Sequence, residues 1–312
     1  MLRIGVVNID VSHPGAFAQI LLEGDRARYV AVYNDGFRGA DEVAGFAKKA
    51  QLEKICASVE ELAEFVDVGF IQGCNWDKHI AYAKPFIDRG KPVFLDKPIV
   101  GNLRDCRTLQ ELVNSGATII GSSSVRYCKE IRAFLDLPEA ERGKVLHVTM
   151  TVGADEFNYA IHALEGVCAL VEARPKTVRY VGGTCRDGQK CETYFVEFEN
   201  GATATYHCQE PNFVSFHTVV MTTTRNMAFT IDSSQLYGAM LEQICNYFEG
   251  KAHILANMEQ LTDSIQVALA GKCSKENGGT AVAIDSKALE TISFDGYAFE
   301  KGYAAAAKPM YL

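Results

Sequence analysis

The sequence has no long apolar run, no stripe of basic residues and no closely paired cysteines, and each absence excludes a class of protein. No run of about 18 apolar residues occurs, so we expect no membrane-spanning helix. Asn8 and Asp10 interrupt the first apolar segment too early for a signal peptide. The 10 cysteines form no Cys-x-x-Cys pair, and without a secretion signal we expect reduced thiols in a cytoplasmic protein.

The composition favours a small-molecule partner. The formal net charge is −8 at pH 7, and without a basic stripe the chain has no surface that would release counterions from nucleic-acid phosphates. At 312 residues and 48% hydrophobic content, the chain can bury two hydrophobic cores. We therefore expect two globular domains, a small-molecule substrate, and neither a nucleic-acid nor a membrane partner.

Strand and helix patterns alternate through the first 121 residues. Strands are predicted at 2–8, 29–33, near 55, 68–71, 92–95 and 116–121, and helices at about 14–23, 40–50, 59–65 and 79–88. This alternation is typical of a doubly wound parallel sheet with helices on both faces. Residues 1–121 are therefore predicted to form one α/β domain.

Amphipathic strands dominate from residue 122 onward, where the pattern changes. They are predicted at 144–152, 177–182, 191–198, 202–208, 214–222 and 227–231, with helices at 234–249 and 257–271 covering one face. The Asn200-Gly201 pair between two alternating runs is a strong hairpin signal. Residues 122–312 are thus predicted to form an α+β domain with an open, mainly antiparallel sheet. Because the helices cover only one face, we expect a homodimer or homotetramer.

The stretch 68–98 carries the clearest chemical signal. It predicts a strand, a helix and a second strand that ends in Asp96-Lys97-Pro98. A parallel strand–helix–strand unit places the residues after its second strand at the carboxyl edge of the sheet, where open α/β folds bind ligands. Lys97 is therefore placed for chemistry, although a surface lysine in an ordinary turn fits the same spacing.

The run RGKPVFLDKP, residues 89–98, resembles the Glu-Lys-Pro signature of the Gfo/Idh/MocA family of oxidoreductases. The resemblance covers nearly the whole chain in its order of elements. It implies a Rossmann dinucleotide-binding domain followed by a substrate-binding and oligomerisation domain. The family's lysine handles substrate and proton beside the nicotinamide, which implies catalytic, substrate-binding and cofactor-binding roles for Lys97. Asp96 stands where the family has glutamate and is expected to lie at the cofactor.

The glycine-rich loop that this family carries after its first strand is altered here. Aligned on that strand, Asn8, Asp10 and His13 stand at the three positions of G-x-G-x-x-G. Glycines there let backbone N–H groups approach a diphosphate, whereas the Asp10 carboxylate repels one. Ser12 suits the N-cap of a helix whose amino end still favours anions. We expect these four residues to lie at the cofactor, with a ligand-free capping loop as the alternative for His13.

Asp35 follows the second strand, where an acid accepts both ribose hydroxyls of NAD. A strand-ending aspartate is also a common turn residue. Because the acid repels the extra phosphate of NADP, the sequence favours NAD over NADP, although Arg38 lies nearby.

The family's Thr-Pro-Asn-x-x-His segment, which passes the nicotinamide side of the pocket, aligns back from His79. On that alignment Cys74, Asn75 and Trp76 take the first three places, and only the histidine is retained. The resemblance therefore implies cofactor contacts for these four residues. A partly buried loop aromatic is the alternative for Trp76.

Two further segments resemble the family's substrate contacts. Arg126 lies in a stretch similar to a segment where an arginine approaches the substrate. Asn158, His162 and Glu165 correspond to the motif Asp-x-Gly-x-His-x-x-Asp and share one helix face. The resemblance implies substrate contacts for Arg126, Asn158 and His162, and makes His162 an acid–base catalyst, since imidazole titrates near neutral pH. A histidine satisfied within the core is the alternative.

A metal centre is another use of such residues. His162 with Glu165, or His207 with Cys208, would supply two ligands, but neither pair comes with a third and a fourth. Adjacent strand residues also point to opposite faces. We therefore expect no metal.

These patterns support two hypotheses of function. The first is an NAD-dependent oxidoreductase that transfers a hydride between nicotinamide and a polyol, sugar or related hydroxy compound, with Lys97 polarising the reacting oxygen and His162 shuttling its proton. The second is a non-catalytic nucleotide- or sugar-binding sensor of the same fold. The altered loop supports the sensor, and the joint retention of Lys97 and His162 supports the enzyme.

Overall fold

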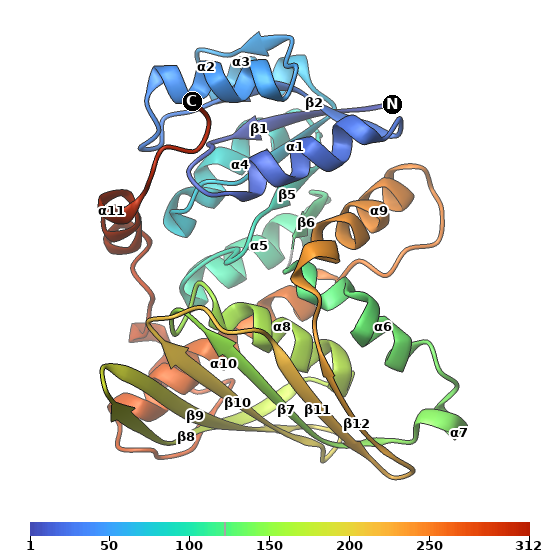
Figure 1. Cartoon of the computed structure of the whole chain (residues 1–312), viewed down its shortest axis with the longest axis vertical. Coiled ribbons are helices and arrows are strands. Elements are labelled where there is room, and N and C mark those ends of the chain that lie inside the picture. The colour runs from blue at the N-terminus through green and yellow to red at the C-terminus, as the bar shows by residue number, and fades with distance from the viewer. Residues whose placement is uncertain (122) are drawn as a thin grey trace.

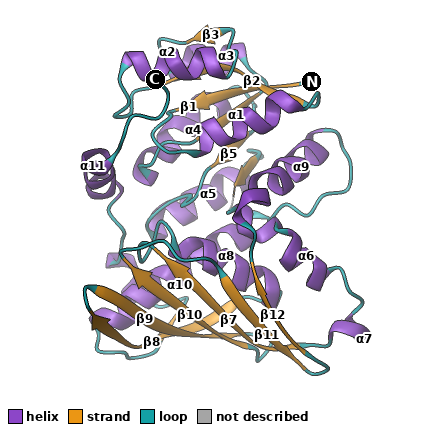
Figure 2. Cartoon of the chain, viewed as in Figure 1, coloured by secondary structure: helices purple, strands orange, loops and turns teal. Residues whose placement is uncertain are grey.

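Two β-sheets, one formed by strands within residues 2–121 and one by strands within residues 145–283, organise the chain (Figures 1 and 2). The computed structural model describes residues 1–121 and 123–312, so the expected domain boundary at Ser122 lies outside the described residues. The first sheet lies towards one end of the long axis and the second towards the other, with helices between them. Within 1–121 and 123–312, no helix has the length and apolar character needed to cross a membrane.

The first sheet is parallel throughout, in the strand order β3-β2-β1-β4-β5-β6. Its strands are β1 (Leu2–Val7), β2 (Ala27–Tyr33), β3 (Lys54–Ile55), β4 (Val68–Ile71), β5 (Val93–Leu95) and β6 (Ile119–Gly121). Its helices are α1 (His13–Glu23), α2 (Ala40–Lys49), α3 (Val59–Phe65), η1 (Trp76–Lys78), α4 (His79–Ile87) and α5 (Leu103–Asn114). The predicted doubly wound sheet is confirmed. Its order places all carboxyl strand ends at one edge, where open α/β sheets bind ligands.

The second sheet is mixed, in the order β12-β11-β7-β10-β9-β8-β13. Its strands are β7 (Val145–Gly153), β8 (Pro175–Arg186), β9 (Gln189–Phe198), β10 (Thr203–Glu210), β11 (His217–Thr222), β12 (Asn226–Thr230) and β13 (Val282–Ala283). β7 and β10 pair in parallel, whereas the other described pairings are antiparallel. The turn between β8 and β9 has positive φ at Asp187 (50°) and Gly188 (78°), as a tight hairpin requires. The expected open, mainly antiparallel sheet is confirmed.

Helices α8 (Ala160–Val171) and α10 (Met258–Glu276) cover one face of the second sheet. On β7, Val148 and Met150 point to that face and are buried, whereas His147 and Thr149 alternate with them and stay partly exposed. The connection from the first sheet to β7 contains η2 (Ser124–Tyr127), α6 (Lys129–Leu135) and α7 (Glu139–Arg142). The period of two along β7 therefore separates a packed face from an open one.

Helix α9 (Leu236–Phe248), preceded by η3 (Ser233–Gln235), packs on a different layer from the one predicted. We expected the segment 234–249 to cover the second sheet, but α9 packs against α1 of the first domain. Its residues Met240 and Ile244 share a core cluster with Phe17 of α1. Helical periodicity indicates that one face is buried, but it does not indicate which layer covers that face.

The C-terminal segment also returns to the first domain. After β13 the chain passes through η4 (Lys287–Thr291) and α11 (Gly296–Ala306), and its end lies beside α2 (Figure 1). Tyr311 is buried with its ring 5.3 Å from that of Phe46. A Cβ at Gly45 would overlap the carbonyl oxygen of Tyr311, so glycine is needed there for the close approach.

Candidate active site

Lys97 joins the two domains. It follows β5, and its Nζ donates to the backbone oxygen of Asn158 at 3.0 Å and to its Oδ1 at 3.1 Å. The ammonium also lies 5.1 Å from the centre of the Tyr159 ring. Burial lowers the pKa of Lys97, while the charges of Asp96 and Asp155 oppose that change. A partly desolvated lysine in this position can hold an oxygen atom and stabilise negative charge on it.

His13 and Asp96 form a close pair beside Lys97. His13 Nδ1 lies 2.6 Å from Asp96 Oδ2, and the imidazole ring stacks on Phe17 with 5.8 Å between centroids. Burial raises the pKa of Asp96, but the charges and hydrogen bonds of His13 and Lys97 outweigh burial and leave that pKa lowered. His13, which replaces a glycine of the family pattern, therefore contacts Asp96, which replaces a glutamate of that pattern. No pattern in the sequence indicates that these two residues meet.

A small cavity of about 50 Å³ lies at this junction. Several predicted site residues line it together with two tyrosines, and the lining is Val11, Ser12, His13, Gln72, Gly73, Cys74, Asp96, Lys97, Asn158, Tyr159 and Tyr303. Ligand sites usually enclose about 300 Å³ or more. The cavity can therefore hold only part of a dinucleotide unless the segment that carries Tyr303 moves.

His162 lies behind Tyr159, with 5.6 Å between the ring centroids, and does not line the cavity. Its Nδ1 is 2.6 Å from Ser123 Oγ, and the residue is 7% exposed. Burial and the positive charges of Lys97 and His13 hold the pKa of His162 well below its ordinary range. The imidazole is therefore neutral at pH 7 and able to accept a proton.

Arg126 and Glu165 face each other in the core. Arg126 Nε donates to Glu165 Oε2 at 2.6 Å, and Ser264 Oγ donates to Glu165 Oε1 at 2.9 Å. The resemblance implied a substrate contact for Arg126, but the structure does not bring this side chain to the cavity. The buried Arg126–Glu165 pair, with Ser264, instead links η2, α8 and α10 by hydrogen bonds.

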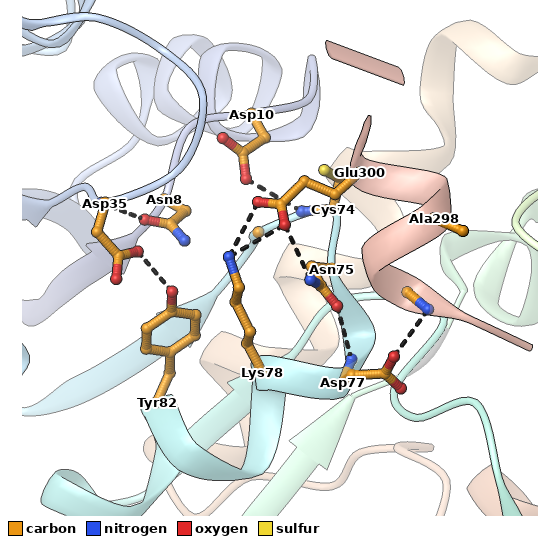
Figure 3. Close-up of polar contacts among 12 residues, drawn as sticks. Asn8, Asp10, Asp35, Cys74, Asn75, Asp77, Lys78, Tyr82, Ala298 and Glu300 are labelled. Carbon is orange, nitrogen blue, oxygen red and sulfur yellow. Dashed lines mark hydrogen bonds and ion pairs between the residues drawn. The ribbon is translucent and has the colours of Figure 1, made fainter. Parts of the chain in front are cut away.

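The altered loop after β1 keeps a backbone shape that glycine would adopt. Asn8 has φ of 66°, a left-handed conformation that asparagine tolerates better than most residues. Its Oδ1 accepts a hydrogen bond from the Asp35 backbone N–H at 2.9 Å, and Asp35 Oδ1 accepts one from the Tyr82 hydroxyl at 2.5 Å (Figure 3). Ser12 occupies the N-cap position of α1, but its side chain makes no capping bond. Asp35 thus lies at the end of β2, as predicted.

Trp76 and His79 hold the turn after β4 in place. Trp76 is buried and its Nε1 donates to the carbonyl oxygen of Phe294 at 2.8 Å. The two ring nitrogens of His79 lie 3.0 Å and 2.9 Å from the carbonyl oxygens of Ile99 and Gly73. Neither side chain lines the cavity. Within residues 74–79, Cys74 is the residue that lines the cavity.

Lys78 and Glu300 were missed by sequence reasoning. Glu300, on α11, accepts hydrogen bonds from Lys78 Nζ at 3.1 Å and 3.0 Å and from Asn75 Nδ2 at 2.9 Å (Figure 3). Ligand atoms of Asp10, Cys74 and Glu300 all lie within 4.8 Å of one another. No local pattern could have found this cluster, because the fold alone brings residue 300 to the first domain.

Larger hollows lie away from this junction. One of about 520 Å³ lies between α5 and α10, and Arg174 in its wall already pairs with Glu259 and Asp263 at 3.0 Å and 3.1 Å. None of the predicted site residues lines this hollow. The smaller cavity, which gathers Lys97, His13 and Asn158, is therefore the candidate active site.

Comparison with known families identifies the type of the first domain. Residues 3–122 match the model of the GFO_IDH_MocA family, described as an oxidoreductase family with an NAD-binding Rossmann fold. Over residues 3–122 the chain is therefore similar to the NAD-binding domain of this oxidoreductase family. The matched residues include the Asp96-Lys97-Pro98 motif and the altered loop, so the resemblance expected from the sequence is confirmed.

Solved structures share the fold of the whole chain. The scyllo-inositol dehydrogenase of Lactobacillus casei, with bound NAD(H) and scyllo-inositol, is 13% identical, with a TM-score of 0.77 over 92% of this chain and 100% of that one. The myo-inositol dehydrogenase of the same organism, in complex with NAD(H) and myo-inositol, is 12% identical, with a TM-score of 0.76 over 92% and 97%. GenD2 from gentamicin A biosynthesis, in complex with NAD, is 14% identical, with a TM-score of 0.76 over 91% and 98%. No curated protein is similar enough to count as a match.

Replacing Asp10 should make the protein more stable in a pH-dependent way. Burial raises the pKa of Asp10 to about 6 from an ordinary value of 3.8, and the nearby Glu300 carboxylate adds to the increase. Because the folded pKa is the higher one, the stabilisation from the protonated form is complete below pH 3.8 and is lost as the pH rises through 6. At about 1.4 kcal/mol per pKa unit, the charged form lowers the free energy of unfolding by about 3 kcal/mol.

We therefore expect Asp10→Asn to raise the free energy of unfolding by about 1–3 kcal/mol at pH 7.5 and by much less at pH 4.5. Urea unfolding at both pH values measures the difference. Asp25→Asn, in an exposed loop, is the matched control and should change stability little at either pH. A destabilised Asp10→Asn at pH 7.5 would contradict the electrostatic account.

Proposed function

We propose that this protein is an NAD-dependent oxidoreductase that transfers a hydride between nicotinamide and a polyol, sugar or related hydroxy compound. The position of Lys97 carries the proposal. The lysine follows β5 in a domain of an NAD-binding family, and it meets Asn158 of the second domain in a shared cavity. Inositol is bound in two proteins of similar fold, which makes polyols the first substrate class to test.

The carboxyl edge of the first sheet has the chemistry that a dinucleotide needs. Asp35 presents a carboxylate suited to ribose hydroxyls, and its charge disfavours the extra phosphate of NADP. The amino end of α1 has no side-chain cap, so its first N–H groups suit an anion. Cys74, Asp96 and Lys97 would then lie at the nicotinamide side, whose C4 atom supplies or accepts the hydride.

The remaining roles fall to residues of the cavity and to His162, which lies behind Tyr159. Lys97 donates a hydrogen bond to the reacting oxygen and stabilises negative charge as it develops there. Asn158, which already bonds Lys97, orients a neighbouring hydroxyl. During oxidation the hydroxyl proton passes to a neutral imidazole, a role that we assign to His162. His13 is the alternative acceptor, because it lines the cavity and Asp96 orients its ring.

A sensor that binds without turnover is the second candidate function. The observation that favours it is the small cavity, which Tyr303 of α11 helps to close. A sensor would bind nucleotide or sugar without changing nicotinamide absorbance, whereas an enzyme would change it in the presence of substrate.

Loss of the Lys97 ammonium should abolish most of the activity. We expect Lys97→Met to lower kcat by about 100- to 1,000-fold, the usual effect of removing one donor to a developing oxyanion. Polyol oxidation with NAD, followed by nicotinamide absorbance, measures the change. Lys84→Met on the exposed side of α4, where the lysine pairs with Asp88, is the control and should keep full activity. A fully active Lys97→Met enzyme would contradict the catalytic role of Lys97.

The two histidines can be separated by pH profiles. A base must be deprotonated, so with the lowered pKa of His162 the wild-type kcat should fall only well below pH 6.5. We expect His162→Gln to lower kcat about 100-fold and to remove this acid limb, and His13→Gln to lower kcat less and to keep it. The reverse pattern would assign the proton to His13 instead.

We also propose that the protein is a homodimer or homotetramer that pairs through the open face of its second sheet. Phe195 of β9, Thr205 of β10, Thr149 of β7 and Val219 of β11 form one row across that face, and Met221 beside them is 40% exposed. Val219→Lys should convert the oligomer to a monomer in size-exclusion chromatography with light scattering, because a buried unpaired charge is costly. Leu22→Lys on α1 is the control, and a monomeric wild-type protein would refute the proposal.

A further inference from the structure

We propose that Glu300 occupies the position of the cofactor's diphosphate, and that Lys78 and Asn75 bind that diphosphate when α11 moves away. This inference rests on the proposed function and adds to it Lys78 as a cofactor-binding residue, the diphosphate as the partner of Asn75, and an intramolecular competitor. The starting observation is that the carboxylate of Glu300 on α11 is bonded to Asn75 and Lys78 in the turn after β4, beside the altered loop, rather than turned to solvent (Figure 3).

The position of Glu300 is that of an anion. Its carboxylate lies within 4.8 Å of the Asp10 carboxylate and the Cys74 sulfur. Asp10 stands at the second glycine position of the loop, the point at which a dinucleotide-binding sheet receives the diphosphate beside the N-terminus of its first helix. A carboxylate of the chain itself is therefore held where the phosphates would lie.

The groups that hold Glu300 are suited to phosphate oxygens. Lys78 Nζ bonds both carboxylate oxygens, and Asn75 Nδ2 bonds one of them. An ammonium and an amide N–H can serve a diphosphate in the same way. These side-chain donors make up for the backbone approach that the lost glycines would have allowed. Lys78 also supplies the positive charge beside Glu300, so the acidic cluster needs no metal ion to explain it.

Helix α11 is mostly exposed and contacts the first domain along one side. Gly296 is its one fully buried residue and donates from its N–H to Asp77 Oδ2 at 2.8 Å, while the Phe299 ring lies 5.0 Å from that of Trp76. The same helix carries Tyr303 into the lining of the small cavity. Segments with few buried apolar contacts open most easily. One movement of α11 would therefore free both the diphosphate position and the nicotinamide end.

Titrations of the full-length protein with NADH, followed by nicotinamide fluorescence, test the exchange. Glu300→Gln keeps the shape of the side chain but removes its charge, and we expect NADH to bind about tenfold more tightly, within the usual range for coupled sites. Lys78→Met should weaken binding by a similar factor. In the double variant, Lys78→Met should cancel the gain from Glu300→Gln, because both residues act on the same position.

Glu290→Gln and Lys84→Met are the matched controls, since their ion pairs with Arg107 and Asp88 lie outside this cluster. Hydrogen exchange gives an independent readout, because NADH should increase exchange in residues 296–306 of the wild-type protein. Unchanged NADH affinity in Glu300→Gln and Lys78→Met, or protection of 296–306 by NADH, overturns this inference and leaves the proposed function standing. Absence of NADH binding in every variant overturns both.

Discussion

Hydrogen bonding of the carboxylates at the carboxyl edge of the parallel sheet is the constraint on which the rest of this structure depends. Because parallel strands end at one edge, Asp10, Asp35 and Asp96 are brought to the same side of the domain. Each carboxylate has a hydrogen-bond donor, namely the Cys74 backbone N–H for Asp10, the Tyr82 hydroxyl for Asp35 and the His13 ring for Asp96. The edge therefore forms an ordered polar network whose members sit on several different loops.

The second domain and the C-terminal segment both add residues to this network. The Lys97 ammonium donates to Asn158, so the turn before α8 is fixed against the end of β5. The Lys78 ammonium donates to the Glu300 carboxylate, so α11 is fixed against the turn after β4. In each case a lysine of the first domain holds a residue that is distant in the sequence. Chemistry at the edge is thus coupled to the position of segments that are not part of the sheet.

The sequence predicted the architecture well because its signals are local. Alternating strands and helices define a parallel sheet whatever their neighbours are, and Asp35 and Lys97 were placed by their positions after strands. The prediction for the segment 234–249 was wrong about its partner, since an apolar helix face fits any complementary layer. Arg126 was assigned to the substrate by resemblance, but Glu165 lies close enough to hold it in the core.

The sequence by itself determined the order of elements, the class of each sheet and the residues that reach the carboxyl edge, because hydrophobic periodicity and strand order act over short distances. The tertiary structure alone decided which of those residues meet. His13 and Asp96 are 83 positions apart, and Lys78 and Glu300 are 222 positions apart. Such pairs depend on how separate layers pack against each other. The periodicity of a sequence does not predict which distant side chains this packing brings into contact.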